Sequence, residues 1–277
     1  MDRKALAGET LEIMERGYYE PFAGECAGHR AQIRIKEDME QSVRRSRLIS
    51  IADGERILET YGTHAGCDQP ETRVENISTV GAIRKLAAEG KTEIGVLNFA
   101  SAKNPGGGFL NGANAQEESL AVSGTLYPTL TAHMEYYEKN RANKSMMYLD
   151  YGIYSPEVVF FRDETFRLTE TPVQASVLTL PAVNMGQVIR KNEDVGEARR
   201  VMRRRMKLAL GIFAEQEAKH LVLGAYGCGV FRNDPKEVAA WWKELLGEGM
   251  GQYFASVFHA VLDHSKGQSC IRAFLEG

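Results

Sequence analysis

Two stretches of the sequence each join a short apolar run, a glycine-rich loop and the start of a helix. In the first, the apolar run 94–100 leads to three consecutive glycines, and residues 116–121 have the composition of a buried helix start. In the second, the apolar run 221–223 leads to a loop with several glycines, and 236–246 has helical composition. Strands that alternate with helices predict an α/β protein with a largely parallel sheet. We expect 94–100 to be a central strand that delivers its glycines to the carboxyl edge, where open α/β sheets bind ligands.

The remaining segments fit the same arrangement, without an internal repeat, a low-complexity tract or a Ser/Pro-rich linker. We therefore expect a single domain over 1–277, with a helical N-terminal extension (1–72) before a core (73–277). Helices are predicted over 2–17, 40–48, 79–87, 197–219 and 236–246, and 123–139 is predicted as helix and turn around Pro128. Strands are predicted over 73–77, 94–100, 176–181, 221–223 and 253–261, the last closing the chain, and 153–161 is predicted as strand, turn and strand around its proline.

The first glycine loop is followed by a group of residues that can carry out acid–base chemistry. The glycines 106–108 have no Cβ, so the backbone can approach a ligand closely and can adopt positive φ angles. Gln116 can donate and accept hydrogen bonds, and Glu117 and Glu118 can move protons. A flexible glycine cradle followed by an acid pair suits the cleavage of a glycosidic bond. The alternative is that both acids only stabilise the N-terminus of a helix.

The second loop, Gly224–Pro235, offers backbone N–H groups and a helix N-terminus, which together suit a phosphate group. The loop matches neither the Walker pattern nor the glycine spacing of the Rossmann fingerprint. A tight turn between strand and helix is the alternative interpretation. We interpret Cys228 inside this loop as a small packing residue and not as a nucleophile.

Composition excludes several other classes of protein. The net charge of −3 and the pI near 6.1 argue against a nucleic-acid binder held by bulk charge, so no specific DNA or RNA binding is expected. No apolar stretch is long enough to span a membrane, and the N-terminus is too charged for a secretory signal, so we expect a cytoplasmic protein. The six histidines lack metal-ligand spacing. The four cysteines, which lack Cys-x-x-Cys spacing, are expected to be reduced thiols: Cys26, Cys67, Cys228 and Cys270.

The order of four segments resembles one family of proteins. These segments are Asn-Phe-Ala-Ser-Ala (98–102), Asn-Pro-Gly-Gly-Gly (104–108), Gln-Glu-Glu (116–118) and Gly-Ala-Tyr-Gly-Cys-Gly-Val-Phe (224–231). They resemble the microbial-type poly(ADP-ribose) glycohydrolases, macrodomain proteins in which a triple glycine is followed closely by Gln-Glu-Glu. The resemblance spans nearly the whole chain. It implies a three-layer α/β/α macrodomain-like fold with a mixed, largely parallel sheet and a helical N-terminal extension.

The resemblance also implies an enzyme. It would hydrolyse ribose–ribose O-glycosidic bonds and release ADP-ribose from chain ends without a cofactor or a metal, and its partners would be poly(ADP-ribose), ADP-ribose and ADP-ribosylated proteins. Two alternatives stay open: a macrodomain hydrolase that acts on mono-ADP-ribosylated proteins, and a non-catalytic module that binds ADP-ribose. A binding module has no use for the acid pair, which counts against the second alternative.

Each site residue takes a role from the resemblance. Glu118 would protonate the departing ribose hydroxyl and then activate water, Glu117 would orient the ribose, and Gln116 would support the pair or bind ribose. Gly106, Gly107 and Gly108 would wrap the diphosphate and the scissile ribose, with Asn104 near the distal ribose. Gly227, Cys228, Gly229 and Val230 would form the second phosphate loop, Phe231 would stack on or wall off the ribose unless it packs in the core, and Tyr226 would join the same wall. The N-terminal extension would cover the adenosine end, and the basic run 199–207 is expected to be a solvated helix face.

Overall fold

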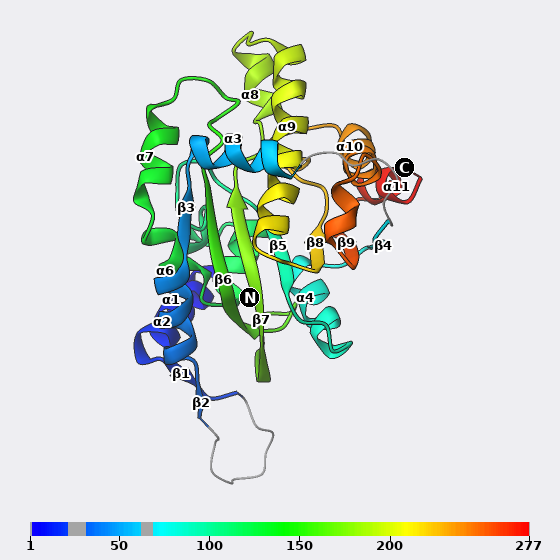
Figure 1. Cartoon of the computed structure of the whole chain (residues 1–277). Helices are drawn as coiled ribbons and strands as arrows, with labels where there is room; N and C mark the ends of the chain where they lie inside the picture. Colours follow the sequence, from blue (N-terminus) through cyan, green and yellow to red (C-terminus); the bar gives the residue numbers. More distant parts are fainter. Residues whose placement is uncertain (1, 22–31, 62–68, 277) are drawn as a thin grey trace.

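The computed structural model describes residues 2–21, 32–61 and 69–276, and its centre is a seven-stranded sheet (Figure 1). The strands of this sheet are β3 (Arg47–Ile49), β4 (Glu71–Glu75), β5 (Ile94–Phe99), β6 (Gly152–Arg162), β7 (Leu168–Leu180), β8 (His220–Leu223) and β9 (Ser256–Ala260). They lie in the order β3-β6-β7-β5-β8-β9-β4. The five strands from β7 to β4 pair in parallel, and β6 pairs antiparallel with both β7 and β3. The sheet is therefore mixed and largely parallel, as predicted.

Helices cover both faces of the sheet. They are α1 (Arg3–Arg16), α2 (Lys36–Arg45), α3 (Ile51–Thr60), α4 (Thr79–Ala88), α5 (Gln116–Ser123), α6 (Leu126–Thr131), α7 (Met134–Ala142), α8 (Met185–Arg190), α9 (Val195–Glu215), α10 (Pro235–Gly247) and α11 (Ser269–Glu276). Short 3-10 helices η1 (Phe109–Asn111) and η2 (Met250–Tyr253), and a small hairpin of β1 (Tyr18–Tyr19) with β2 (Ile33–Arg34), complete the described chain. None of the helices in the described ranges is long and apolar enough to cross a membrane.

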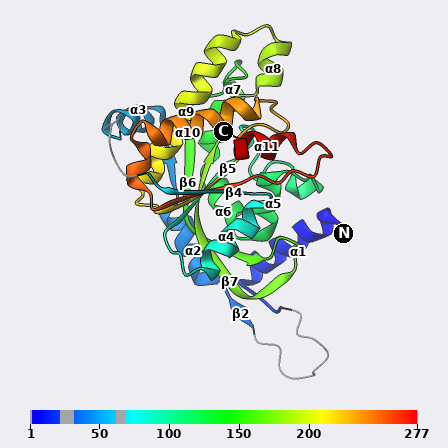
Figure 2. The same ribbon diagram turned by 90° about the vertical axis from the view of Figure 1, so that its right-hand side faces the viewer.

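The apolar run of β5 explains the three layers. Successive side chains of a strand point to opposite faces, so a strand that is buried on both faces needs an unbroken apolar run. Leu97 lies in a core cluster with residues of α3, α9 and α10, whereas Val96 lies in the opposite cluster with residues of α4, α5 and α6. Figure 2 shows α9 and α5 on opposite sides of the strands. The central position predicted for 94–100 is confirmed by its place between β7 and β8.

Several predicted boundaries are wrong, each for a local reason. The predicted helix 40–48 ends at Arg45, because residues 47–49 pair with β6 as the edge strand β3. The segment 153–161 is not broken by a turn: it belongs to one continuous strand, β6, whose register shifts between Ser155 and Val158. Such a bulge accommodates Pro156, which has no N–H for the ladder. The strand predicted to close the chain is β9, but a helix that was not predicted, α11, follows it.

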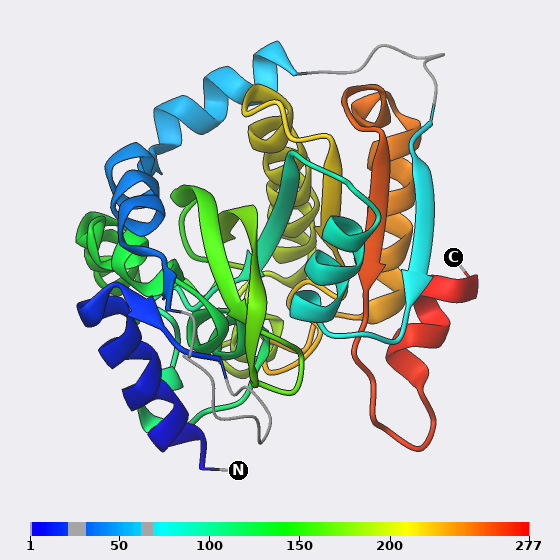
Figure 3. The same ribbon diagram turned by 90° about the horizontal axis from the view of Figure 1, so that it is seen from below.

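Only part of the N-terminal segment 1–72 is separate from the core of the protein. Helices α1 and α2 lie side by side at one edge (Figure 3). However, β3 joins the main sheet and α3 packs on α9, although both precede residue 73. The division at residue 72 stays a prediction, and the cysteines at 26 and 67 lie outside the described residues.

Candidate active site

The two glycine loops follow neighbouring parallel strands. β5 and β8 pair directly, with Val96 opposite Val222. After β5 the chain passes to α5 on the face covered by α4, and after β8 it passes to α10 on the face covered by α9. The loops therefore leave the carboxyl edge in opposite directions, which creates the crevice at which open α/β sheets bind ligands. The topology brings together the two motifs that are more than 100 residues apart in the sequence.

The backbone of the first loop requires glycine at two positions. Gly106 and Gly107 have φ angles of +66° and +62°. A Cβ on Gly107 would lie 2.3 Å from Oε1 of Glu118, and a Cβ on Gly106 would lie 2.8 Å from the ring of Phe109. The glycines thus allow the loop to lie directly against the acid pair.

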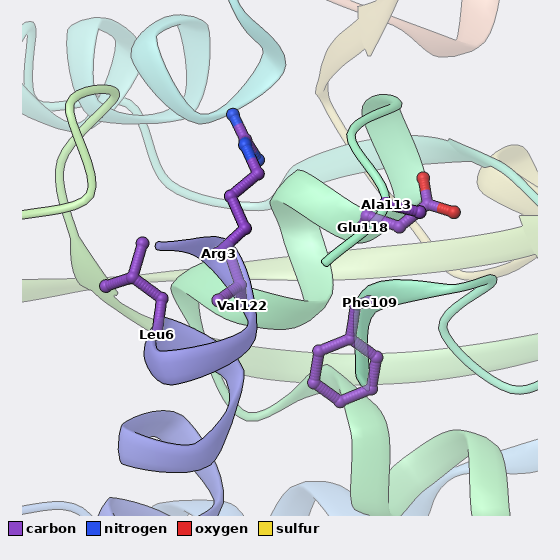
Figure 4. Close-up of a pocket in the computed structure, with 6 residues that line it drawn as sticks. All are labelled: Arg3, Leu6, Phe109, Ala113, Glu118 and Val122. Carbon is purple, nitrogen blue, oxygen red and sulfur yellow. The ribbon is translucent and has the colours of Figure 1, made fainter. Parts of the chain in front are cut away.

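Glu118 is held by the loop that precedes it. Its Oε1 accepts the N–H of Gly108 at 2.9 Å, and its Oε2 accepts the N–H of Ala115 at 3.0 Å. The side chain is only partly buried, and it borders a small cavity. Figure 4 shows this cavity, whose other lining residues come from α1, from η1, from the loop between η1 and α5, and from the rest of α5: Arg3, Leu6, Phe109, Ala113 and Val122. The orientation of the Glu118 carboxylate is therefore fixed by two backbone amides.

Glu117 occupies a different environment from its neighbour. Its side chain is 3% exposed, its Oε2 accepts the N–H of Ser101 at 2.7 Å, and its Oε1 accepts an amide N–H of Asn98 at 3.2 Å. Burial raises the pKa of Glu117 to about 8, and the negative charge of Glu118 adds to the rise, although the bonds from Ser101 and Asn98 oppose it. Burial therefore keeps the Glu117 carboxyl mainly in its protonated form near neutral pH.

Gln116 supports the framework of the site. Its Oε1 accepts the N–H of Phe99 at 2.9 Å, and its Nε2 donates to the carbonyl of Leu97 at 2.9 Å and to Oγ1 of Thr79 at 3.2 Å. These bonds tie the start of α5 to the end of β5 and to α4. Of the two roles predicted for Gln116, the geometry favours the supporting one.

The second loop has a fixed base and an exposed tip. Gly227 has a φ angle of +72°, and a Cβ there would lie 2.6 Å from Ala182 and from the side-chain nitrogen of Asn233. That nitrogen donates to the carbonyl of Gly227 and to that of Val183 after β7. By contrast, Val230 at the tip is 81% exposed.

The tip of the second loop carries free hydrogen-bond donors. Within the described part of the chain, the N–H groups of Gly229, Val230 and Phe231 have no acceptor. Three consecutive amides of this kind can bind an anion. The loop has the glycine-rich composition that suits a phosphate group, and its backbone N–H groups are available to donate hydrogen bonds.

Two aromatic residues of the second motif differ in position. Tyr226 is completely buried, donates its hydroxyl to the carbonyl of Leu180 at 3.0 Å, and packs its ring on Phe99. Tyr226 therefore belongs to the core and not to the wall of the crevice, contrary to the prediction. Phe231 is half-buried, with its ring centre 6.0 Å from that of Tyr148, so it can contribute a wall while it packs on the core.

The remaining predicted residues are placed as follows. The Cys228 thiol packs on the core, and burial raises its pKa well above the usual range, which fits the packing role. Asn104 is exposed and donates its N–H to Oγ of Ser101 at 3.1 Å. Asn98, Ser101 and Asn233 were missed as site residues, although all three lie inside segments that were singled out. Their residue types gave the signal, because buried amide and hydroxyl groups need hydrogen-bond partners.

Each arginine of the basic run on α9 has an acidic partner within the molecule. Arg199 pairs with Glu237, and Arg203 with Glu244 and Glu248. The other three arginines also have acidic partners: Arg200 with Glu197, and Arg204 and Arg205 with Asp150. These pairs support the interpretation of the run as a helix face and not as a surface for a polyanion.

The comparisons with known proteins agree with this geometry. The family model described as the catalytic domain of microbial-type poly(ADP-ribose) glycohydrolase matches residues 7–163. The chain is 38% identical to the poly(ADP-ribose) glycohydrolase of Thermomonospora curvata, with a TM-score of 0.92 over 99% of this chain and 98% of that one. A second structure of that protein, bound to the inhibitor ADP-HPD, is 38% identical, with a TM-score of 0.90 over 99% and 98% of the two chains.

A third structure extends the likeness to another organism. The Deinococcus radiodurans poly(ADP-ribose) glycohydrolase in complex with ADP-ribose is 40% identical, with a TM-score of 0.82 over 86% of this chain and 96% of that one. The search of curated proteins found no match. The family model covers more than half of the chain, and the structural likeness extends over almost all of it. The chain belongs to the family of microbial-type poly(ADP-ribose) glycohydrolases.

Proposed function

We propose that this protein hydrolyses the ribose–ribose O-glycosidic bonds of poly(ADP-ribose) and releases ADP-ribose. The observation that carries the proposal is the pair Glu117–Glu118, held by a triple-glycine loop at the crevice between β5 and β8. The relatives whose structures contain ADP-ribose or ADP-HPD support the substrate class. We place the enzyme in the cytoplasm, acting on poly(ADP-ribose) and ADP-ribosylated proteins.

Glu118 is proposed as the residue that exchanges protons with the substrate. Cleavage passes through an oxocarbenium-like state, and the departing ribose hydroxyl needs a proton because an alkoxide is a poor leaving group. Glu118 is the more accessible member of the pair, and the amides of Gly108 and Ala115 hold its carboxylate. It would give its proton to the leaving oxygen and, as a carboxylate, would then accept a proton from the attacking water.

Glu117 is proposed to orient the ribose. Burial, with a smaller contribution from the neighbouring Glu118, raises the pKa of Glu117, so this carboxyl retains its proton near neutral pH. A protonated Glu117 can donate a hydrogen bond as well as accept one. A sugar hydroxyl also donates and accepts hydrogen bonds, so a protonated Glu117 suits a contact with it.

The diphosphate is proposed to bind at the tip of the second loop. The free N–H groups of Gly229, Val230 and Phe231 support this placement. In the first loop, by contrast, the N–H of Gly107 donates to the carbonyl of Asn104 and that of Gly108 donates to Glu118. The first loop therefore contributes mainly by fixing the acid pair.

A preference for chain ends is part of the proposal, and the N-terminal extension is proposed to cover the adenosine end of the substrate. Helix α1 of this extension packs against η1 and against α5, the helix that carries the acid pair. Digestion of long polymer tests the preference: ADP-ribose should appear from the start, and early release of longer free oligomers would contradict it.

The proposed activity is tested by measuring ADP-ribose release from purified poly(ADP-ribose) by the wild-type protein and by Glu118→Gln. We expect the wild type to degrade the polymer, and Glu118→Gln to bind ADP-ribose in calorimetry without cutting. If neither protein cuts polymer but both bind ADP-ribose, the protein is a binding module. If the wild type removes ADP-ribose only from mono-ADP-ribosylated protein, the protein is a macrodomain hydrolase that acts on mono-ADP-ribosylated proteins.

A further inference from the structure

We propose that Thr10 of the N-terminal helix is a positioning residue for the catalytic helix α5, an inference that rests on the proposed function. Thr10 is completely buried, and its hydroxyl donates to the carbonyl of Val122 at 2.7 Å, across 112 residues of sequence. Val122 lies in the last turn of α5, and Glu118 lies in the first. The hydroxyl thus contacts the far end of the helix that carries the proton donor.

The carbonyl that Thr10 binds has no partner inside its own helix. The last four carbonyls of any α-helix lack an intrahelical N–H, and a buried one that stays unpaired costs about 1–3 kcal/mol. α5 has 8 residues, so a displacement of its C-terminal turn is transmitted over only about one turn to Glu118. A short helix of this kind depends on contacts at both ends for its orientation.

Thr10 is itself held by a buried arginine of the sheet. Arg162 on β6 is 2% exposed, and its Nε donates to the hydroxyl oxygen of Thr10 at 3.4 Å. Its other nitrogens donate to Glu9 at 2.7 Å and to the carbonyl of Phe166 at 3.0 Å. A hydroxyl can accept one bond while it donates another, so the contacts run from β6 through α1 to α5 without a break.

Apolar contacts fix the same helix on the same side of the site. Ala7 of α1 packs in one small cluster with Phe109 of η1 and with Val122 of α5. In Figure 2 α1 lies beside α5. The N-terminal helix therefore holds the region of the acid pair, and the hydroxyl of Thr10 is its specific polar contact with α5.

A second buried hydroxyl of the N-terminal segment provides a matched control. Ser42 of α2 is 1% exposed, and its hydroxyl donates at 2.5 Å to the carbonyl of Pro156 on β6, across 114 residues. This bond is of the same kind and also starts from a helix of the N-terminal segment, but it joins α2 to β6 and does not involve α5. Thr10→Val and Ser42→Ala each remove a buried hydroxyl and leave a backbone carbonyl unpaired.

The experiment compares the full-length wild type with Thr10→Val, Thr10→Ser and Ser42→Ala in polymer cleavage, in calorimetric binding of ADP-ribose, and in amide hydrogen exchange. We expect Thr10→Val to lower kcat about tenfold or more, because small displacements of a catalytic group are costly, and to leave KM and the Kd for ADP-ribose within about twofold. Thr10→Ser should restore kcat, and Ser42→Ala should match the wild type. Exchange should accelerate in residues 116–123 for Thr10→Val alone.

Two results would overturn the inference. One is an equal kcat for Thr10→Val and Ser42→Ala, and the other is unchanged exchange in 116–123 for Thr10→Val. An inactive wild type would refute the proposed function instead, and the exchange comparison would still decide whether Thr10 holds α5.

Discussion

The buried carboxyl of Glu117 should make the stability of the protein depend on pH in a way that a single substitution removes. The pKa of Glu117 is raised from 4.5 to about 8, mainly by burial. Between these values the folded protein binds a proton that the unfolded chain does not. The free energy of unfolding therefore falls as the pH rises through this window, by at most about 1.4 kcal/mol per pH unit for one proton.

Histidines oppose this trend at lower pH. Burial lowers the pKa of His259 from 6.5 to about 4, and the pKa values of His133 and His220 are also lowered, chiefly by burial. For these residues the unfolded chain binds the extra proton, so their contribution to stability rises with pH until the unfolded chain has lost that proton, about one pH unit above its pKa of about 6.5. The same histidines titrate in the wild type and in Glu117→Gln, so the difference in stability between the two proteins isolates Glu117. The stability of the wild type relative to that variant should decrease by roughly 2 kcal/mol between about pH 6.5 and about pH 8.

Urea unfolding followed by circular dichroism at several pH values tests this expectation with Glu117→Gln. The variant should be less stable than the wild type at pH 6.5, because a glutamine NH2 cannot accept the N–H bonds that Ser101 and Asn98 donate. Its free energy of unfolding should, however, lack the fall of roughly 2 kcal/mol that Glu117 contributes to the wild type between about pH 6.5 and about pH 8. Equal slopes in the two proteins would show that Glu117 is ionised in the folded state, and the protonation assigned to it would be wrong.

Three further predictions concern the loops and the charge of the protein. Gly107→Ala should reduce kcat at least tenfold in the polymer assay without unfolding the protein, because the new Cβ would lie 2.3 Å from Glu118 at a position with positive φ. Gly229→Ala should keep the wild-type kcat in the same assay, because the space around Gly229 is open. Tyr226→Phe should cost about 1 kcal/mol in urea unfolding and leave KM for polymer unchanged, since its hydroxyl serves the core. KM should rise less than about threefold between roughly 50 and 200 mM salt, because the arginines of α9 are already ion-paired; a rise of a hundredfold would indicate several direct cation contacts.

The central strands and the position of the loops could be predicted because their signal is local. The apolar runs at 94–100 and 221–223 have the length and composition of buried strands, and a glycine-rich loop follows each run within a few residues. Parallel strands expose their carboxyl ends at one edge, so two such loops meet if their strands are neighbours. The pairing of Val96 with Val222 supplies that condition.

The failures arise where a distant partner decides the structure. Tyr226 has the same local sequence whether it faces the crevice or Leu180, and only the packing of β7 beside β5 decides between them. Pro156 predicts a break in a strand, yet the neighbouring strand β7 accommodates it through a shift in register. The boundary at Arg45 likewise depends on pairing with β6, which no local propensity reports.

The contrast between the two glutamates has the same origin and has a chemical consequence. Successive residues of a helix point about 100° apart, so two adjacent acids cannot share one environment. Glu117 lies on the face that continues through the buried Leu120 and Ala121, and it is drawn under the end of β5. An isolated buried carboxylate would be costly, so Glu117 retains its proton, whereas Glu118 is only partly buried and is held by the backbone amides of Gly108 and Ala115. The position of the helix relative to β5 thus places two identical side chains in different environments, one buried under the end of the strand and one at the edge of a cavity, and such a difference lets paired carboxyl groups take different roles in acid–base catalysis.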